Sequence, residues 1–134
     1  MLKYINMSIK FKTIQKGNPQ NIAIPAKFYA HAIIDEEITF EELIDTVANN
    51  SKMSYADCYR VLLNLEDTVT KELQNGKAIR LGGIGSFKIG IGSNGFPTEK
   101  QVTATTINSA KINFLPGKGL KKMLKILTYK KVKS

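Results

Sequence analysis

The chain is poor in the residues that carry most catalytic and metal chemistry. It has one cysteine, one histidine and no tryptophan, so no disulfide can form within it. Cys58 falls among the apolar positions of an expected helix, which predicts a buried structural thiol. His31 has no cysteine or carboxylate pair near it at ligand spacing, which argues against a metal site or histidine-based catalysis. We therefore expect no metal, no cofactor, no small-molecule substrate and no enzymatic activity.

Long apolar runs are also missing. No stretch approaches the roughly 20 apolar residues that a membrane-spanning helix needs, so we expect a cytoplasmic protein with no membrane partner. A length of 134 residues and a hydrophobic content of 43 % suit one compact domain with a small extension. Met7 is an alternative start to Met1, because the strand pattern that follows does not need the first six residues.

Acidic residues are absent from the C-terminal end, where the positive charge is concentrated. Residues 111–134 hold eight lysines and no acid, in a chain whose net charge is +9. Residues 1–34 are also free of acids, whereas residues 35–72 carry ten acids against three bases. A basic surface of this kind is tolerated when a polyanion neutralises it, and nucleic acid phosphate is the usual partner. A solvated, solubilising tail is the alternative interpretation.

Local patterns predict strands followed by a helical hairpin. Alternating apolar residues predict strands at residues 5–11 and 28–34, with turn formers at residues 16–21 between them. Thr39 and Glu42 form a capping box that begins a helix over residues 39–50. A second capped helix begins at Ser54 and ends before Gly76. The apolar stripe of this hairpin is too long for its two helices to bury alone.

After the hairpin the pattern changes to strands and turns. Strands are expected at residues 78–81 and 84–89, and the glycine cluster between them is a tight turn, because it lacks the Lys-Ser/Thr ending of a phosphate-binding loop. The glycine-rich residues 90–99 are expected to be a flexible excursion. Further strands are expected at residues 102–107 and 111–114, followed by a Pro-Gly turn and a closing basic helix.

Two motifs in this order resemble the HU/IHF family of bacterial histone-like DNA-binding proteins. Residues 80–87, Arg-Leu-Gly-Gly-Ile-Gly-Ser-Phe, are similar to its Gly-aromatic-Gly-small-Phe signature, and residues 114–121, Phe-Leu-Pro-Gly-Lys-Gly-Leu-Lys, to its closing motif. The likeness covers residues 38–127. Residues 16–21, Lys-Gly-Asn-Pro-Gln-Asn, are similar to a stretch in a longer, Bacteroidetes-type branch of HU-like proteins, which extends the likeness to nearly the whole chain.

The resemblance implies an α+β, IHF-like fold. It consists of an N-terminal helical hairpin, an antiparallel saddle with a protruding β-arm, and a C-terminal helix, with extra N-terminal strands. We expect residues 1–37 to form a β extension packed on the main domain, and residues 38–134 to form the HU/IHF-like domain with its basic tail. The family also implies an intertwined dimer; we expect a homodimer, with a heterodimer left open. The expected dimer core consists of Leu43, Val47, Val61, Leu62, Leu65, Val69, Phe87 and Phe114.

The same resemblance implies sequence-nonspecific architectural binding of double-stranded DNA in the nucleoid, with bending and compaction by a basic saddle and β-arms. We expect Arg80 and Lys88 to contact DNA phosphate from the saddle, in preference to forming salt bridges within the fold. Pro97, beside Phe96, occupies the place of the apolar wedge with which minor-groove proteins kink DNA. The candidate DNA-binding residues are Arg80, Ser86, Lys88, Asn94, Phe96, Pro97, Lys100, Lys111, Lys118, Lys121 and Lys122.

The arm departs from the family pattern. Residues 89–110 carry only Lys100 against Glu99 and no arginine, whereas the family's arm is rich in arginine. Binding through the arms should therefore be weak. An HU-like dimeric scaffold with weak DNA affinity, acting in protein–protein interaction, stays as the alternative function.

Overall fold

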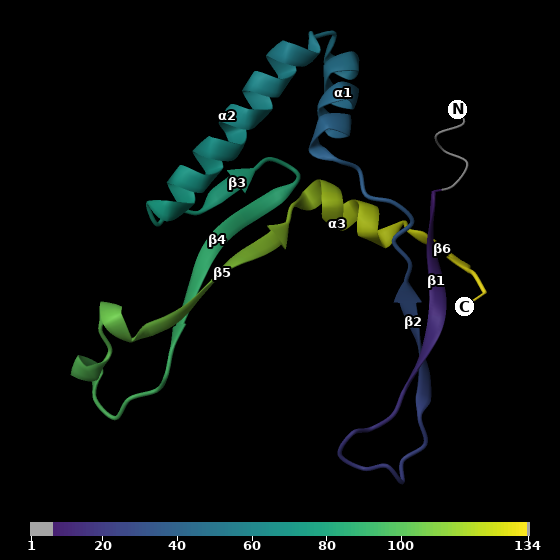
Figure 1. Ribbon diagram of the computed structural model, residues 1–134, viewed down its shortest axis with the longest axis vertical. Helices are drawn as coiled ribbons and strands as arrows, with labels where there is room; N and C mark the ends of the chain where they lie inside the picture. The colour runs from purple at the N-terminus through teal and green to yellow at the C-terminus, as the bar shows by residue number, and fades with distance from the viewer. Residues whose placement is uncertain (1–6, 134) are drawn as a thin grey trace. The chain divides into compact units, whose positions relative to one another are not determined.

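The computed structural model describes residues 7–133 and divides into two compact units (Figure 1). The first unit combines the residues up to Ile38 with those from Met123 onward, and the second unit runs from Thr39 to Lys122. The fold is α+β, as expected, with three α-helices and two three-stranded sheets in the described chain. The last helix, α3 (Lys118–Lys125), begins in the second unit and ends in the first.

The first unit is built on a sheet made from both ends of the chain, here called the terminal sheet. Its central strand β1 (Ser8–Lys16) pairs antiparallel with β2 (Lys27–Ala32) and parallel with β6 (Thr128–Lys131). The amide of Val132 continues the β6 pairing by donating to the Phe11 carbonyl at 2.9 Å. A basic tail was expected at this end of the chain, and β6 was not predicted. Its pairing partner lies at the other end of the sequence.

The second unit begins with the helical hairpin. Helix α1 (Phe40–Ser51) starts where the Thr39 hydroxyl accepts the Glu42 amide at 3.2 Å. Helix α2 (Tyr55–Gln74) starts in the same way, with the Ser54 hydroxyl accepting the Asp57 amide at 3.1 Å. Both caps were predicted and are confirmed, because capping depends on residues close together in the sequence.

The hairpin leads into an antiparallel sheet, here called the central sheet, in the order β3 (Ile79–Leu81), β4 (Gly85–Ser93) and β5 (Ile107–Pro116). The expected flexible excursion at residues 90–99 was wrong for residues 90–93, which belong to β4. The strand expected at residues 111–114 lies within β5, whereas the one expected at residues 102–107 was wrong for residues 102–106, because β5 starts at Ile107. Residues Ala104–Thr106 form a 3-10 turn.

Hydrogen bonds from a threonine side chain stabilise the 3-10 turn at Ala104–Thr106. The Thr106 hydroxyl accepts a hydrogen bond from the Thr103 backbone amide at 3.0 Å and donates one to the Thr103 carbonyl at 2.8 Å. Side-chain bonds of this type compete with the hydrogen bonds of a strand ladder. A second 3-10 turn covers Glu99–Gln101.

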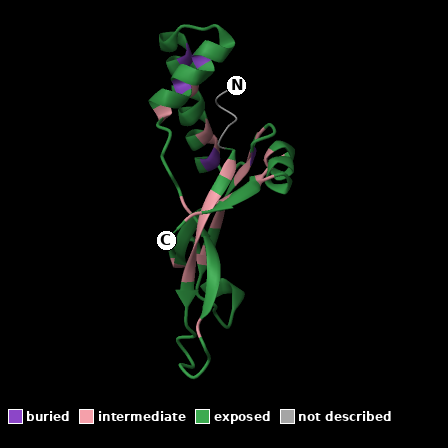
Figure 2. Cartoon of the chain, turned by 90° about the vertical axis from the view of Figure 1, so that its right-hand side faces the viewer, coloured by how far each residue is buried: buried purple, intermediate pink, exposed green. Residues whose placement is uncertain are grey.

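The buried core of the described chain is small. The buried apolar residues are Ile44, Ala48, Cys58 and Leu73, and Figure 2 shows buried segments chiefly on the helices. The thiol of Cys58 is buried, as predicted. Many large apolar side chains of the second unit are exposed. Among residues 7–133, no helix has the length and apolar character required to cross a membrane.

Candidate nucleic-acid interface

The two sequence motifs meet in space at a pair of backbone turns. The Gly117 amide donates to the Ile84 carbonyl at 2.9 Å, which ties the Pro-Gly turn to the turn between β3 and β4. The Lys121 amide then donates to the Gly117 carbonyl at 2.9 Å and begins α3. A side chain at Gly117 would place its Cβ 2.5 Å from the Gly83 carbonyl oxygen. Glycine at this position therefore allows the two turns to touch.

A cavity of about 390 Å³ lies where these turns meet. Its charged lining residues are Arg80, Lys118 and Lys121, and no acid lines it in the described chain. The first turn of α3 supplies backbone amides with no partner within the helix, and such amides attract anions. The cavity therefore has the chemistry of a phosphate site. Lys122 is exposed on α3 but does not line this cavity.

One face of the central sheet continues this positive charge. The register places Arg80 opposite Ser86, Lys88 opposite Asn113, and Lys111 opposite Gly90, all on the same face of the sheet. A second cavity of about 390 Å³ includes Arg80, Ser86, Lys88 and Asn113 in its lining. Asn113 was not among the predicted site residues. Its position two residues after Lys111 on the same strand could have placed it on this face.

Ion pairing does not neutralise these cations within the described chain. The salt bridges among residues 7–133 join Lys10 to Asp35, Arg60 to Asp57, and Lys77 to Glu72. Neither Arg80 nor Lys88 is paired with a carboxylate there. Both side chains are exposed, so they are available to an external anion.

The opposite face of the central sheet is apolar. Phe87 lies opposite Phe114, and Ile89 lies opposite Ile112. Phe114 is 45 % exposed and Ile112 is 62 % exposed. This face is therefore largely uncovered in a single chain.

The helical hairpin also presents uncovered apolar side chains. Of the residues expected to form a dimer core, Leu62 and Val69 are half-buried, and Leu62 packs against the buried cluster of the single chain. The exposed members of that set on the hairpin are Leu43, Val47, Val61 and Leu65.

The segment expected to form the β-arm connects the end of β4 at Ser93 to the start of β5 at Ile107. The Asn94 side chain accepts a hydrogen bond from the Asn108 amide group at 3.3 Å, which links the two sides of the arm. Phe96 is 37 % exposed and Pro97 is exposed. Lys100 lies in the 3-10 turn after them. The arm thus presents an apolar pair near one cation.

Comparisons with known proteins identify the family. The model of the family described as "HU domain fused to wHTH, Ig, or Glycine-rich motif" matches residues 7–131. The chain belongs to this HU-domain family. No curated protein matches the chain.

Solved structures resemble this HU-domain chain as well. One is a protein from Bacteroides vulgatus that is described as a candidate bacterial DNA-binding protein. It is 16 % identical to this chain with a TM-score of 0.67, and the match covers 95 % of this chain and 49 % of the Bacteroides vulgatus chain. That likeness shows a shared fold, and this chain spans about half the length of that protein. The HU protein of Thermotoga maritima is 26 % identical with a TM-score of 0.45, covering 64 % of this chain and 97 % of its own. A single-residue variant of that HU is 27 % identical with a TM-score of 0.47 and the same coverage.

Membership of the HU-domain family confirms that the chain is not an enzyme. Within residues 7–133, no group of three or more histidine, cysteine, aspartate or glutamate side chains could hold a metal ion.

Proposed function

We propose that the protein binds double-stranded DNA without sequence preference, as a dimer, and acts as an architectural protein of the nucleoid. The family is an HU-domain family, and the Bacteroides vulgatus protein of the same fold is described as a candidate DNA-binding protein. The expected contact residues are the cations of the central sheet and of α3.

The observation that carries this proposal is the cavity between the two turns. Arg80, Lys118 and Lys121 line it together with the turn glycines. Lysine contacts phosphate as a point charge, and contacts to phosphate carry no base-sequence information. A site of this composition fits a phosphodiester backbone and explains why binding should be nonspecific.

Dimer formation is the second part of the proposal. The exposed apolar residues of the hairpin and of the central sheet are more numerous than the four buried ones. A continuous apolar face is normally covered by another chain. We expect a homodimer, since each copy would present the same apolar residues.

Bending is the third part. The arm carries an apolar pair, Phe96 and Pro97, at the place where minor-groove proteins insert a wedge. Its one lysine and one glutamate give it little attraction to phosphate. We infer that the cations of the sheet and of α3 supply the affinity, while the arm supplies the deformation of the duplex.

The test is the salt dependence of binding to duplexes of random sequence. Each phosphate contact contributes about 0.9 to the slope of log affinity against log salt. Changing Lys118, Lys121 and Lys122 to Ala should lower that slope by about 2.7 if all three contact phosphate. A charge-matched control changes Arg60, Lys71 and Lys77 to Ala on and just after α2, and it should leave most of the slope intact. Equal slopes in the wild type and the first variant would contradict the proposal.

A protein-interaction scaffold is the second candidate function. The weakly charged arm and the exposed apolar residues favour it. Absence of duplex binding by a folded wild-type dimer at low salt would select this alternative.

A further inference from the structure

The terminal sheet has two faces of opposite character. Strand alternation and the register of β1 with its two neighbours assign the side chains to these faces. A hydrogen bond of 2.8 Å between the Ser8 and Thr128 hydroxyls agrees with that assignment. One face, here called the lysine face, carries Lys10, Lys12, Lys16, Lys27 and Lys130. The other face has an apolar cavity of about 350 Å³, lined by Ile9, Phe11, Ala30, Ala32 and Tyr129.

Like charges stand directly opposite one another on the lysine face. Lys16 is the register partner of Lys27, and Lys10 is the register partner of Lys130. Directly opposed like charges destabilise a sheet, each pair by a few tenths of a kcal/mol up to about 1 kcal/mol. In residues 7–133, the carboxylate paired with these lysines is Asp35, which lies 3.2 Å from the Lys10 ammonium. The remaining charge has no internal partner in that part of the chain.

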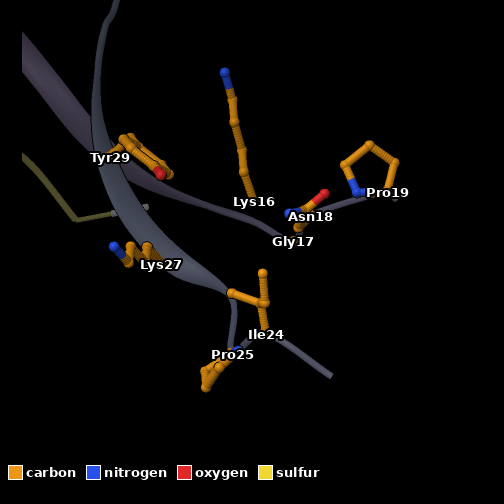
Figure 3. Close-up of a pocket in the computed structure, with 8 residues that line it drawn as sticks. All are labelled: Lys16, Gly17, Asn18, Pro19, Ile24, Pro25, Lys27 and Tyr29. Carbon is orange, nitrogen blue, oxygen red and sulfur yellow. The ribbon is translucent and has the colours of Figure 1, made fainter. Parts of the chain in front are cut away.

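Two of these lysines flank the turn that connects β1 to β2. Lys16, Lys27 and Tyr29 line a cavity of about 400 Å³ together with residues of the connecting turn (Figure 3). The Lys16 ammonium lies 5.9 Å from the centre of the Tyr29 ring. Lys16 and Lys27 are both exposed. An external polyanion can therefore reach this end of the sheet.

We propose that the lysine face is a second contact surface for duplex DNA, on a unit separate from the candidate interface described above. This inference rests on the proposed function. The distance from Lys10 to Lys16 along β1 is about 20 Å, at about 3.3 Å per residue. Duplex DNA presents one negative charge per about 1.7 Å of axis, so a row of this length meets many phosphates.

The aromatic residues favour duplex over single-stranded nucleic acid. Proteins that bind single strands stack bases on aromatic side chains. The lysine face has two described aromatic residues, Tyr29 and His31, whereas Phe11, Phe28 and Tyr129 lie on the opposite face. The lysine face thus offers phosphate contacts with little stacking.

The first experiment removes charge from the lysine face in the full chain. Lys12→Gln, Lys16→Gln and Lys27→Gln are combined, and Lys10 is kept because it pairs with Asp35. The loss of three phosphate contacts should lower the slope of log affinity against log salt by about 2.7. Between 50 and 200 mM salt, the variant should therefore lose about 40-fold less affinity than the wild type loses. The control combines Arg60→Gln, Lys71→Gln and Lys77→Gln, and it should keep most of the wild-type slope. An equal slope in a folded lysine-face variant overturns the inference.

A second measurement needs no variant. Acetylation rates of individual lysines in the wild type are compared by mass spectrometry with and without saturating duplex. We expect Lys16 and Lys27 to be protected severalfold, and Lys131, which pairs with Phe11 on the opposite face, to react at an unchanged rate. Protection of Lys118 and Lys121 without protection of Lys16 and Lys27 overturns this inference and leaves the proposed function intact.

The remaining outcomes also decide the question. If the wild type binds no duplex at low salt, the proposed function and this inference fail together. If single-stranded RNA protects Lys16 and Lys27 and duplex DNA does not, the partner assigned here is wrong.

Discussion

Phe87 and Phe114 stand opposite each other on β4 and β5, with ring centroids 4.9 Å apart and ring planes tilted by 44°. This aromatic pair marks the apolar face of the central sheet, and Phe114 is 45 % exposed there. The polar face of the same strands carries Lys88 and Lys111. The sheet therefore has one face suited to a second protein chain and one suited to an anion.

We expect the protein to be a dimer at micromolar concentration in light scattering. Replacing Leu65, which is 40 % exposed in a single chain, with Asp would bury a charge in the proposed dimer core and should dissociate or unfold the protein. The control is Asn64→Asp, which adds the same charge at the neighbouring exposed position and should leave the dimer intact. A folded, monomeric wild type would show that the apolar residues have another role.

A second prediction concerns the turn that holds the candidate phosphate site. The Cβ of Gly117→Ala would meet backbone atoms of Gly83 at 2.5 and 2.8 Å, and backbone atoms cannot rotate away as a side chain can. We expect a loss of about 1–3 kcal/mol in the free energy of unfolding, together with weaker DNA binding, because Lys118 and Lys121 follow this turn. Gly95→Ala is the matched control, since nothing lies within 4 Å of its added Cβ. Equal thermal stability of the two variants would mean that the turns do not need this contact.

The sequence predicted well those parts of the fold that depend on neighbouring residues. The caps at Thr39 and Ser54, the αα-hairpin and the Pro-Gly turn before α3 all have local causes, and all are present. Residues of both sequence motifs line the cavity at the two turns. The contact between the two turns depends on the hydrogen bond from the Gly117 amide to the Ile84 carbonyl. Residues more than 30 positions apart make that bond, so only the family resemblance could bring them together.

Prediction failed where a distant strand decides the conformation. Gly90 and Gly92 favour a flexible loop by composition, yet both lie in β4. An added Cβ on Gly90 would meet the Asn113 side chain at 2.7 Å, and one on Gly92 would meet the Ser109 hydroxyl at 2.7 Å. Side chains of β5 therefore fold over these glycines and occupy the space that a Cβ would take. The lysine face was missed for the same reason, because its residues come from three strands.

A third prediction follows from the pairing of β6 with β1. A chain that ends at Leu127 loses the strand that covers one edge of β1, so the β1 amides directed toward β6 should exchange with solvent much faster. Amides in the middle of α2 should keep their protection, because they belong to the other compact unit. Hydrogen exchange read by mass spectrometry measures both in one experiment. Unchanged exchange in β1 would mean that β6 contributes little to the order of the terminal sheet.

The last prediction separates affinity from bending. An apolar wedge can hold a kink only while the rest of the protein is anchored on the duplex, and in this chain Lys100 is the one cation of the arm. Replacing Phe96 and Pro97 with Ala should therefore reduce the bending of a duplex, measured by energy transfer between its labelled ends. Affinity should stay within about threefold, equivalent to under about 0.7 kcal/mol, because Arg80, Lys118 and Lys121 are untouched. Val102→Ala, which truncates another exposed apolar residue of the arm, should leave bending unchanged. If the double variant lost most of its affinity but still bent the duplex, the arm would supply affinity and not bending. A wild type that does not bend DNA would favour the scaffold function.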